Sequence, residues 1–335
     1  MADFNASVDN NDQLDTNSDL SKVSQRSLSL ALDRKILQGH KASAHGDPTY
    51  ASHLELTGAT HAGNWLHATP SPNTGNYMDP LLYRISVQRW LRAPIFPEDS
   101  VCPLCDGVLD KYGDHCLTCS MGGDRTKRHN RLRNHVFHFC ASAGLFPELE
   151  KPGLLPPRPY QGALPENGVR VQDTSARRPA DVYLPRWRQG LPMALDFAVT
   201  SGLRPDVVAQ SAQNADAAVN RYEDFKGNHL DTARTCAEEG LGFSPVVMEA
   251  HGGSWGPVAG KVFAELAQTK SLLTGEPQDH LLGQLYQNLS VILHRENARS
   301  ILKRSRTFTH NLDHILSSAT TLQAEAADAA SVATA

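Results

Sequence analysis

Four of the six cysteines fall within eighteen residues, and this crowding constrains the fold more than any other feature of the chain. The segment from 101 to 123 is rich in glycine and cysteine and has neither helical nor strand periodicity, so a hydrophobic core cannot order it. In a reducing compartment, clustered cysteines indicate a metal site more than disulfides. A bound ion is therefore expected to fold this segment.

The spacing within the segment predicts a zinc knuckle. Two residues separate Cys102 from Cys105, and three separate His115 from Cys119. Zinc takes four sulfur or nitrogen ligands in a tetrahedron, which two such short pairs can supply from opposite sides. Cys116 is an alternative fourth ligand, less favoured because it adjoins His115, and a set of free thiols is the other interpretation. A closed four-ligand site has no open position, so Zn²⁺ is expected to be structural.

Composition divides the rest of the chain. With 335 residues and 40% apolar content, the chain can bury at least one core. Residues 1–60 are polar and are expected to form a disordered leader, 61–100 a short helical linker region, and 306–335 a flexible Ala-rich tail. No apolar run is long enough to span a membrane, and no secretory signal begins the chain, so we expect an intracellular protein that is nuclear if it acts on chromosomal DNA.

Residues 124–305 are expected to form an α/β domain with a mixed sheet flanked by helices. Apolar residues recur at three- and four-residue intervals from Asn130 to Ala143, which predicts a helix. Two short strands, at 182–184 and 193–200, are expected to form a hairpin. The remaining elements expected are a helix over 207–225, a strand over 245–250, a helix ending at 273 and a helix over 279–303.

Two aspartates lie on the expected hairpin. Asp181 heads the first strand, and Asp196 stands in the middle of the second with apolar neighbours on both sides. Burying such a charge is costly unless a metal or a partner compensates it. Together with a third carboxylate from Glu150 or Glu148, this pair would make an oxygen site suited to Mg²⁺ beside a phosphate. The alternative is that these aspartates only accept hydrogen bonds or pair with an arginine such as Arg178.

Basic residues are segregated along the chain, although the net charge of −4 argues against a nucleic-acid binder when taken whole. One basic stretch runs from Arg125 to Arg133 and a second from Arg295 to Arg306. The triplet 128–130 stands at the expected start of a helix, where free N–H groups attract phosphate. Asn130 could instead be a helix cap, and His129 a packing histidine. Each basic stretch could equally be a solvated helix face.

Lys226 stands out because it continues an apolar stripe through Ala215 and Tyr222, where lysine is rare. Near the last turn of its helix it could instead extend outward to solvent. His251, beside two glycines, is expected to be structural.

The order of these motifs resembles the C-terminal part of site-specific non-LTR retrotransposon proteins. In that family a zinc knuckle precedes a restriction-like endonuclease of the PD-(D/E)xK class. The matching order is a Cys-Cys-His-Cys knuckle, then Arg-His-Asn, then Arg-Pro-x-Asp, and then an Asp after fourteen further residues. The similarity spans roughly residues 60–305. It implies a restriction-endonuclease-like sheet and a chain that lacks the family's polymerase domain.

The resemblance also implies roles. Asp181 and Asp196 would bind catalytic Mg²⁺ with Glu150, and Glu148 is the alternative to Glu150. The lysine expected two residues after Asp196 is missing, and Lys226 is its substitute. DNA, with RNA left open as a substrate, would be contacted by a basic set: Arg125, Lys127, Arg128, His129, Asn130, Arg131 and Arg178.

The expected activity is therefore Mg²⁺-dependent hydrolysis of phosphodiester bonds in DNA. A catalytically inactive, zinc-stabilised nucleic-acid-binding module is the alternative from another class. A purely structural zinc protein is a third possibility, although it leaves the buried Asp196 unexplained.

Overall fold

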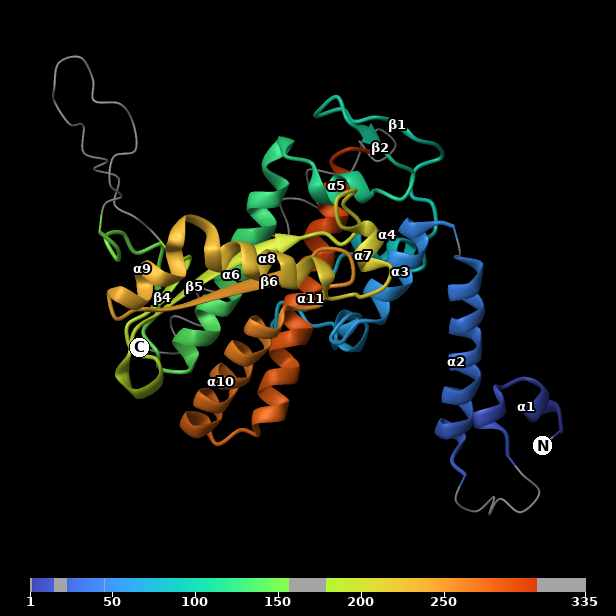
Figure 1. Cartoon of the computed structure of the whole chain (residues 1–335), viewed down its shortest axis with the longest axis horizontal. Helices are drawn as coiled ribbons and strands as arrows, with labels where there is room; N and C mark the ends of the chain where they lie inside the picture. Colours follow the sequence, from blue (N-terminus) through green and yellow to red (C-terminus); the bar gives the residue numbers. More distant parts are fainter. Residues whose placement is uncertain (1, 15–22, 45, 157–178, 306–335) are drawn as a thin grey trace.

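A four-stranded mixed sheet lies at the centre of the computed structural model, which describes residues 2–14, 23–44, 46–156 and 179–305 (Figure 1). The strands are ordered β3 (Glu148–Leu149), β4 (Val182–Leu184), β5 (Met193–Thr200) and β6 (Gly242–Glu249). The pairs β3–β4 and β4–β5 are antiparallel, whereas β5 pairs with β6 in parallel. The α/β class is confirmed, and β4 and β5 have the predicted bounds.

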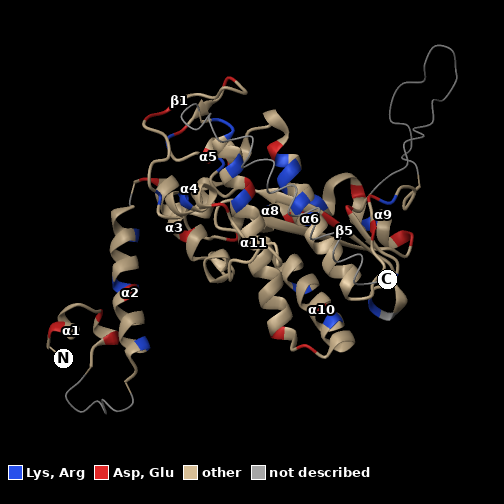
Figure 2. Ribbon diagram, turned by 180° about the vertical axis from the view of Figure 1, so that it is seen from behind, with Lys and Arg blue, Asp and Glu red and all other residues tan. Residues whose placement is uncertain are grey.

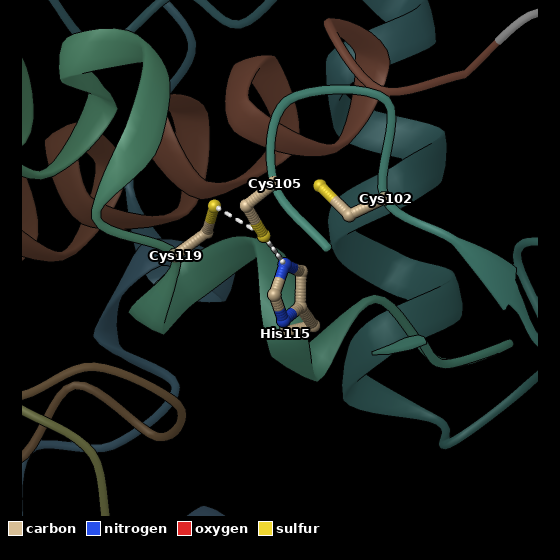
Figure 3. Close-up of side chains that lie close together, drawn as sticks. All are labelled: Cys102, Cys105, His115 and Cys119. Carbon is tan, nitrogen blue, oxygen red and sulfur yellow. Dashed lines mark hydrogen bonds between the residues drawn. The ribbon is translucent and has the colours of Figure 1, made fainter. Parts of the chain in front are cut away.

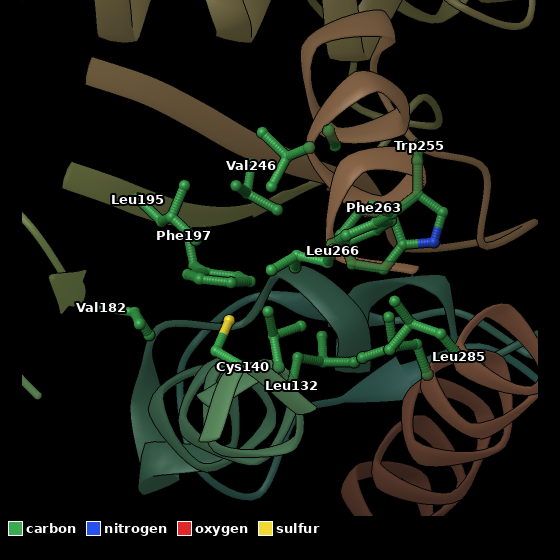
Figure 4. Close-up of a cluster of buried hydrophobic side chains, with 14 of the residues drawn as sticks. Leu132, Cys140, Val182, Leu195, Phe197, Val246, Trp255, Phe263, Leu266 and Leu285 are labelled. Atoms are coloured by element: carbon green, nitrogen blue, oxygen red, sulfur yellow. The ribbon is translucent and has the colours of Figure 1, made fainter. Parts of the chain in front are cut away.

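Helices cover both faces of this sheet. One face carries α6 (Asp124–Ser142), α10 (Pro257–Thr274) and α11 (Gln278–Leu302), and the other carries α8 (Ala217–Asn228) and α9 (Thr232–Glu238). Side chains alternate along β5, so Leu195 and Phe197 enter the main core with α6 while Ala198 packs on Val219 of α8. Asp196 shares the parity of Ala198 and therefore faces α8. Figure 4 shows the main core.

The C-terminal half of α11 is buried along its whole length. It is surrounded by α6, α10, η3 (Asn64–His67), α4 (Pro80–Trp90) and α5 (Asp114–Thr118). Asp79 caps α4 by accepting a hydrogen bond from the Leu81 N–H, and Pro80 fits the first helical position. The predicted helical region between 61 and 100 thus packs against α11.

Two helix predictions need correction. Helix α6 begins at Asp124, after a left-handed Gly123, so the triplet 128–130 lies inside the helix and Asn130 is not its cap. The predicted helix over 207–225 is split into α7 (Val208–Ser211) and α8. The Asn214 side chain accepts a hydrogen bond from the Asp216 N–H, an Asx turn that competes with helical geometry.

The leader prediction is also wrong in part. Residues before 60 include α1 (Ala2–Ala6), α2 (Gln25–Ser43) and α3 (Pro48–Gly58). Asp47 caps α3 by accepting from the N–H groups of the first turn, and Ser52, His53 and Leu56 are buried against the domain. A short helix without a marked apolar stripe gives little periodic signal. The predicted tail, 306–335, lies outside the described residues.

In the described part of the chain, every helix is too short or too polar to cross a membrane.

The packing of α3 predicts a large effect of Gly252→Ala. A Cβ at Gly252 would lie 2.1 Å from the backbone oxygen of Leu56, so α3 would have to move. Overpacking of this kind costs about 1–3 kcal/mol of unfolding free energy. The matched control is Gly260→Ala in α10, where the new Cβ would lie 3.8 Å from the Tyr286 hydroxyl oxygen, an ordinary contact. Chemical denaturation checks both variants, and equal stability of Gly252→Ala and the wild type would contradict the docking of α3.

Candidate functional site

The four predicted knuckle ligands lie together (Figure 3). The ligand atoms of Cys102, Cys105, His115 and Cys119 are all within 4.8 Å of one another. The Sγ atoms of Cys119 and Cys105 are 3.6 Å apart, close to the edge of roughly 3.8 Å that a tetrahedron with Zn–S bonds of about 2.3 Å would have. This cluster can hold a metal such as zinc.

The knuckle fold is built from a hairpin and one short helix. Strand β1 (Ser100–Val101) precedes the turn that carries Cys102 and Cys105, strand β2 (Val108–Leu109) follows it, and α5 carries His115. The Asp110 carboxylate accepts from the N–H of His115 at 2.7 Å and fixes the start of α5. A Cβ at Gly107 would lie 2.7 Å from the His115 ring, so this turn requires glycine.

The group of side chains that can hold a metal contains His115 and leaves out Cys116. Cys116 is buried in an apolar cluster with Leu82 and Ile301, and burial raises the pKa of its thiol. Burial also raises the pKa of Cys102, but the N–H groups of Leu104 and Cys105 outweigh it and lower that pKa to about 6. This shift favours the thiolate form of Cys102, which is the form that binds metal.

The predicted carboxylates meet at the β4–β5 pair. Asp181 precedes β4, and its N–H donates to the Leu195 oxygen at 2.9 Å while its Oδ2 accepts from the Phe197 N–H at 2.7 Å. This places its carboxylate beside that of Asp196. Burial is the largest influence on the Asp196 pKa and raises it; Lys226 opposes the rise, and the neighbouring Asp181 adds to it.

Lys226 reaches this pair from α8. Its Nζ donates to Oδ1 of Asp196 at 3.0 Å and to Oδ2 at 2.8 Å, and both side chains are about one-fifth exposed, at 22% and 21%. The alternative in which Lys226 extends to solvent is therefore excluded. The stripe through Tyr222 correctly indicated an inward lysine.

His129 approaches the pair from α6. Its Nε2 lies 3.2 Å from Oδ2 of Asp181 and 3.2 Å from the Phe197 oxygen. A carbonyl oxygen only accepts, so Nε2 carries the proton. Burial lowers the pKa of His129, but its hydrogen bond to Asp181 and the charge of that residue outweigh burial, and the net shift is upward. Asn130 contacts the other ring nitrogen at 3.2 Å.

The predicted third carboxylate is directed elsewhere. The Glu150 side chain pairs with Arg133, and the Glu150 backbone N–H donates to the backbone oxygen of Asp181 at 3.1 Å. Glu148 pairs with Lys151 at 2.7 Å on the surface. Within the described ranges, the knuckle is the only group of three or more His, Cys, Asp or Glu residues arranged to hold a metal.

Basic residues gather along α6 (Figure 2), and they divide into exposed and buried side chains. Arg125 and Lys127 are exposed, and Arg131 is partly exposed beside Glu296. Arg128 is buried and donates to Asn297 and to the Leu117 oxygen, which corrects its predicted role in phosphate binding. Arg178 lies outside the described residues.

The second basic stretch is likewise mostly internal. Arg295 and Arg299 are buried because the whole C-terminal half of α11 is enclosed, and Arg304, just beyond the helix, is buried against Asp124 and Met121. The prediction that this stretch presents a charged surface is therefore wrong, and Arg306 falls outside the described residues.

His251 is buried as expected, between His53 at 2.7 Å and Arg89 at 2.6 Å. Sequence patterns did not indicate this contact, because His53 precedes His251 by almost two hundred residues.

Comparison of the chain with models of known families and with curated proteins finds no match. The similarity to retrotransposon endonucleases rests on the order of the motifs alone.

Metal analysis tests the knuckle. The purified protein is expected to hold one zinc ion per chain, and Cys105→Ser should release it, because losing one thiolate opens the tetrahedron. Cys116→Ser should retain the ion. Loss of zinc from Cys116→Ser, with retention by Cys105→Ser, would reverse the assignment.

A double-mutant cycle tests the Asp196–Lys226 pair. In metal-free buffer at neutral pH, Lys226→Met should lower the unfolding free energy by about 2–4 kcal/mol, because it leaves a largely buried carboxylate uncompensated. Without Lys226 the pKa of Asp196 should rise further, and a carboxylate with a raised pKa destabilises the fold once it ionises at higher pH. The stability lost in Lys226→Met should therefore be smaller in acid. The double variant Lys226→Met/Asp196→Asn should recover most of the unfolding free energy that Lys226→Met loses, as measured by chemical denaturation. Additive single effects would contradict the pairing.

Proposed function

We propose that the chain is a Mg²⁺-dependent DNA endonuclease with a restriction-like α/β domain and a structural zinc knuckle, derived from a non-LTR retrotransposon. One observation carries this proposal: Lys226, thirty residues beyond Asp196 in sequence, lies on its carboxylate. The PD-(D/E)xK pattern requires a lysine near this aspartate. Position 198, where the pattern expects it, is an alanine, and Lys226 takes its place.

The donor set agrees with a hard divalent cation. Two partly buried carboxylates, Asp181 and Asp196, lie side by side, and such oxygens are the ligands that Mg²⁺ prefers. When bound there, Mg²⁺ would act as a Lewis acid and lower the pKa of a bound water.

The protein's own groups complete the proposed mechanism. Lys226 stabilises the negative charge that develops on the phosphate. His129 acts as a positioning residue, since its Nε2–H and the Phe197 N–H both hold Oδ2 of Asp181. The exposed Arg125 and Lys127 at the start of α6 contact the DNA backbone near this site. Their contribution to DNA affinity should fall as the salt concentration rises.

The inactive binding module is the second candidate, and two contacts favour it. Glu150 is held by Arg133, and Lys226 uses both oxygens of Asp196, as a purely structural ion pair would. Such a protein would bind nucleic acid through the same basic residues without cleaving it.

Plasmid nicking separates the two candidates. The zinc-loaded full chain should nick supercoiled plasmid only when Mg²⁺ is added, and Asp181→Asn/Asp196→Asn should reduce the rate about 100-fold or more while retaining salt-sensitive binding. Asp206→Asn, at an exposed ion pair with Arg204, is the matched control and should remain active.

Undiminished nicking by the double variant would exclude these aspartates from catalysis. Absence of nicking by every protein, with binding intact, would favour the inactive module.

A further inference from the structure

Three arginines converge on one carboxylate in a polar seam between α6, α11 and residues 75–79. Oε1 of Glu296 lies 2.5 Å from Nη1 of Arg299, 3.1 Å from Nε of Arg131 and 3.9 Å from Nε of Arg295. Guanidinium groups this close repel one another unless enough negative charge lies between them. One carboxylate oxygen cannot serve three such groups.

The seam also contains buried donors without acceptors. In the described part of the chain, Nε and Nη2 of both Arg295 and Arg299 are buried and have no hydrogen-bond partner. Only 4% of Arg295 and 7% of Arg299 is exposed. Nη1 of Arg295 is already used by the oxygens of Gly75 and Tyr77. Buried charged donors without acceptors are strongly destabilising, so the seam lacks an acceptor group.

The other groups facing the seam do not supply it. Asp79 acts on Arg299 through its charge, but its carboxylate already caps α4. His135 is neutral, because burial and the charges of His138 and Arg295 lower its pKa to about 4. Burial lowers the pKa of Arg295 only to about 10, so it stays charged at neutral pH. The seam therefore holds three cations against two carboxylates.

We propose that this seam binds a phosphate group. Arginine forks match the oxygens of phosphate, and one phosphate can accept from several guanidinium groups at once. Arg131 forms the accessible edge, with 24% of its side chain exposed, and it lies one helical turn after the exposed Lys127. The phosphate therefore enters from the basic start of α6. Its source is either a nucleic-acid strand or a free phosphate compound.

The proposal does not rest on the nuclease. Within α6, His129 points to the sheet and Arg131 to α11, so the two sites use different sides of one helix. The seam could bind phosphate in a protein without catalytic activity.

Thermal unfolding of the zinc-loaded full chain tests the seam, at constant ionic strength and without added Mg²⁺. Replacing chloride by inorganic phosphate should raise the midpoint by about 2–4 °C or more in the wild type. Arg295→Lys and Arg299→Lys keep the charge but lose the planar fork, and the shift should largely disappear. Arg234→Lys, at an exposed ion pair on α9, is the control and should respond as the wild type does.

Two further measurements of the unfolding midpoint distinguish a nucleic-acid strand from a free phosphate compound as the source of the phosphate group. A short single-stranded DNA is compared with and without a terminal phosphate. Stabilisation by both DNAs points to a strand, and stabilisation by inorganic phosphate alone to a free compound.

Calorimetric titration of the wild type with phosphate decides the matter if the lysine variants do not fold, because saturable binding would support the site. No binding by any probe, or an equal shift in all variants, would overturn it.

Discussion

The buried side-chain amide of Asn297 in α11 links three parts of this structure: the sheet, helix α6 and, through Arg128, the knuckle. Its nitrogen donates to the Ala250 oxygen at the end of β6, and its oxygen accepts from Arg128 of α6, each at 2.8 Å. The same arginine donates to the Leu117 oxygen of the knuckle at 2.9 Å. Because buried polar groups need all their partners, moving any one element would leave several groups unpaired. The knuckle is therefore part of the domain core.

This contact also sets the geometry of the candidate site. Each residue of a helix is turned by about 100° from the one before it, so fixing Arg128 toward α11 directs His129 toward the sheet. His129 thereby reaches Asp181, while Leu132 enters the main core. A residue expected to bind DNA instead orients its neighbour, and the knuckle contributes to that orientation through Leu117.

Local patterns predicted much of the fold and site, and contacts between distant segments account for the rest. The knuckle ligands follow from short spacings, and the β4–β5 hairpin from two short strand segments close together in the sequence, so the sequence was sufficient for both. The burial of Arg128 and Arg295 depends on partners more than a hundred residues away, and charge alone suggested a surface. Glu150 was expected beside Asp181, but an arginine on α6 holds its side chain. No spacing rule reveals such competition.

The position of the lysine follows from the packing of β5. A lysine at 198 would share the face of Asp196, but that face is closed by α8, where Ala198 packs on Val219 and Val247. The cation beside Asp196 comes instead from the helix that covers this face, as Lys226 does. Replacing such a buried ion pair by apolar residues is often neutral or stabilising. Stability alone therefore does not account for an aspartate and a lysine at this contact.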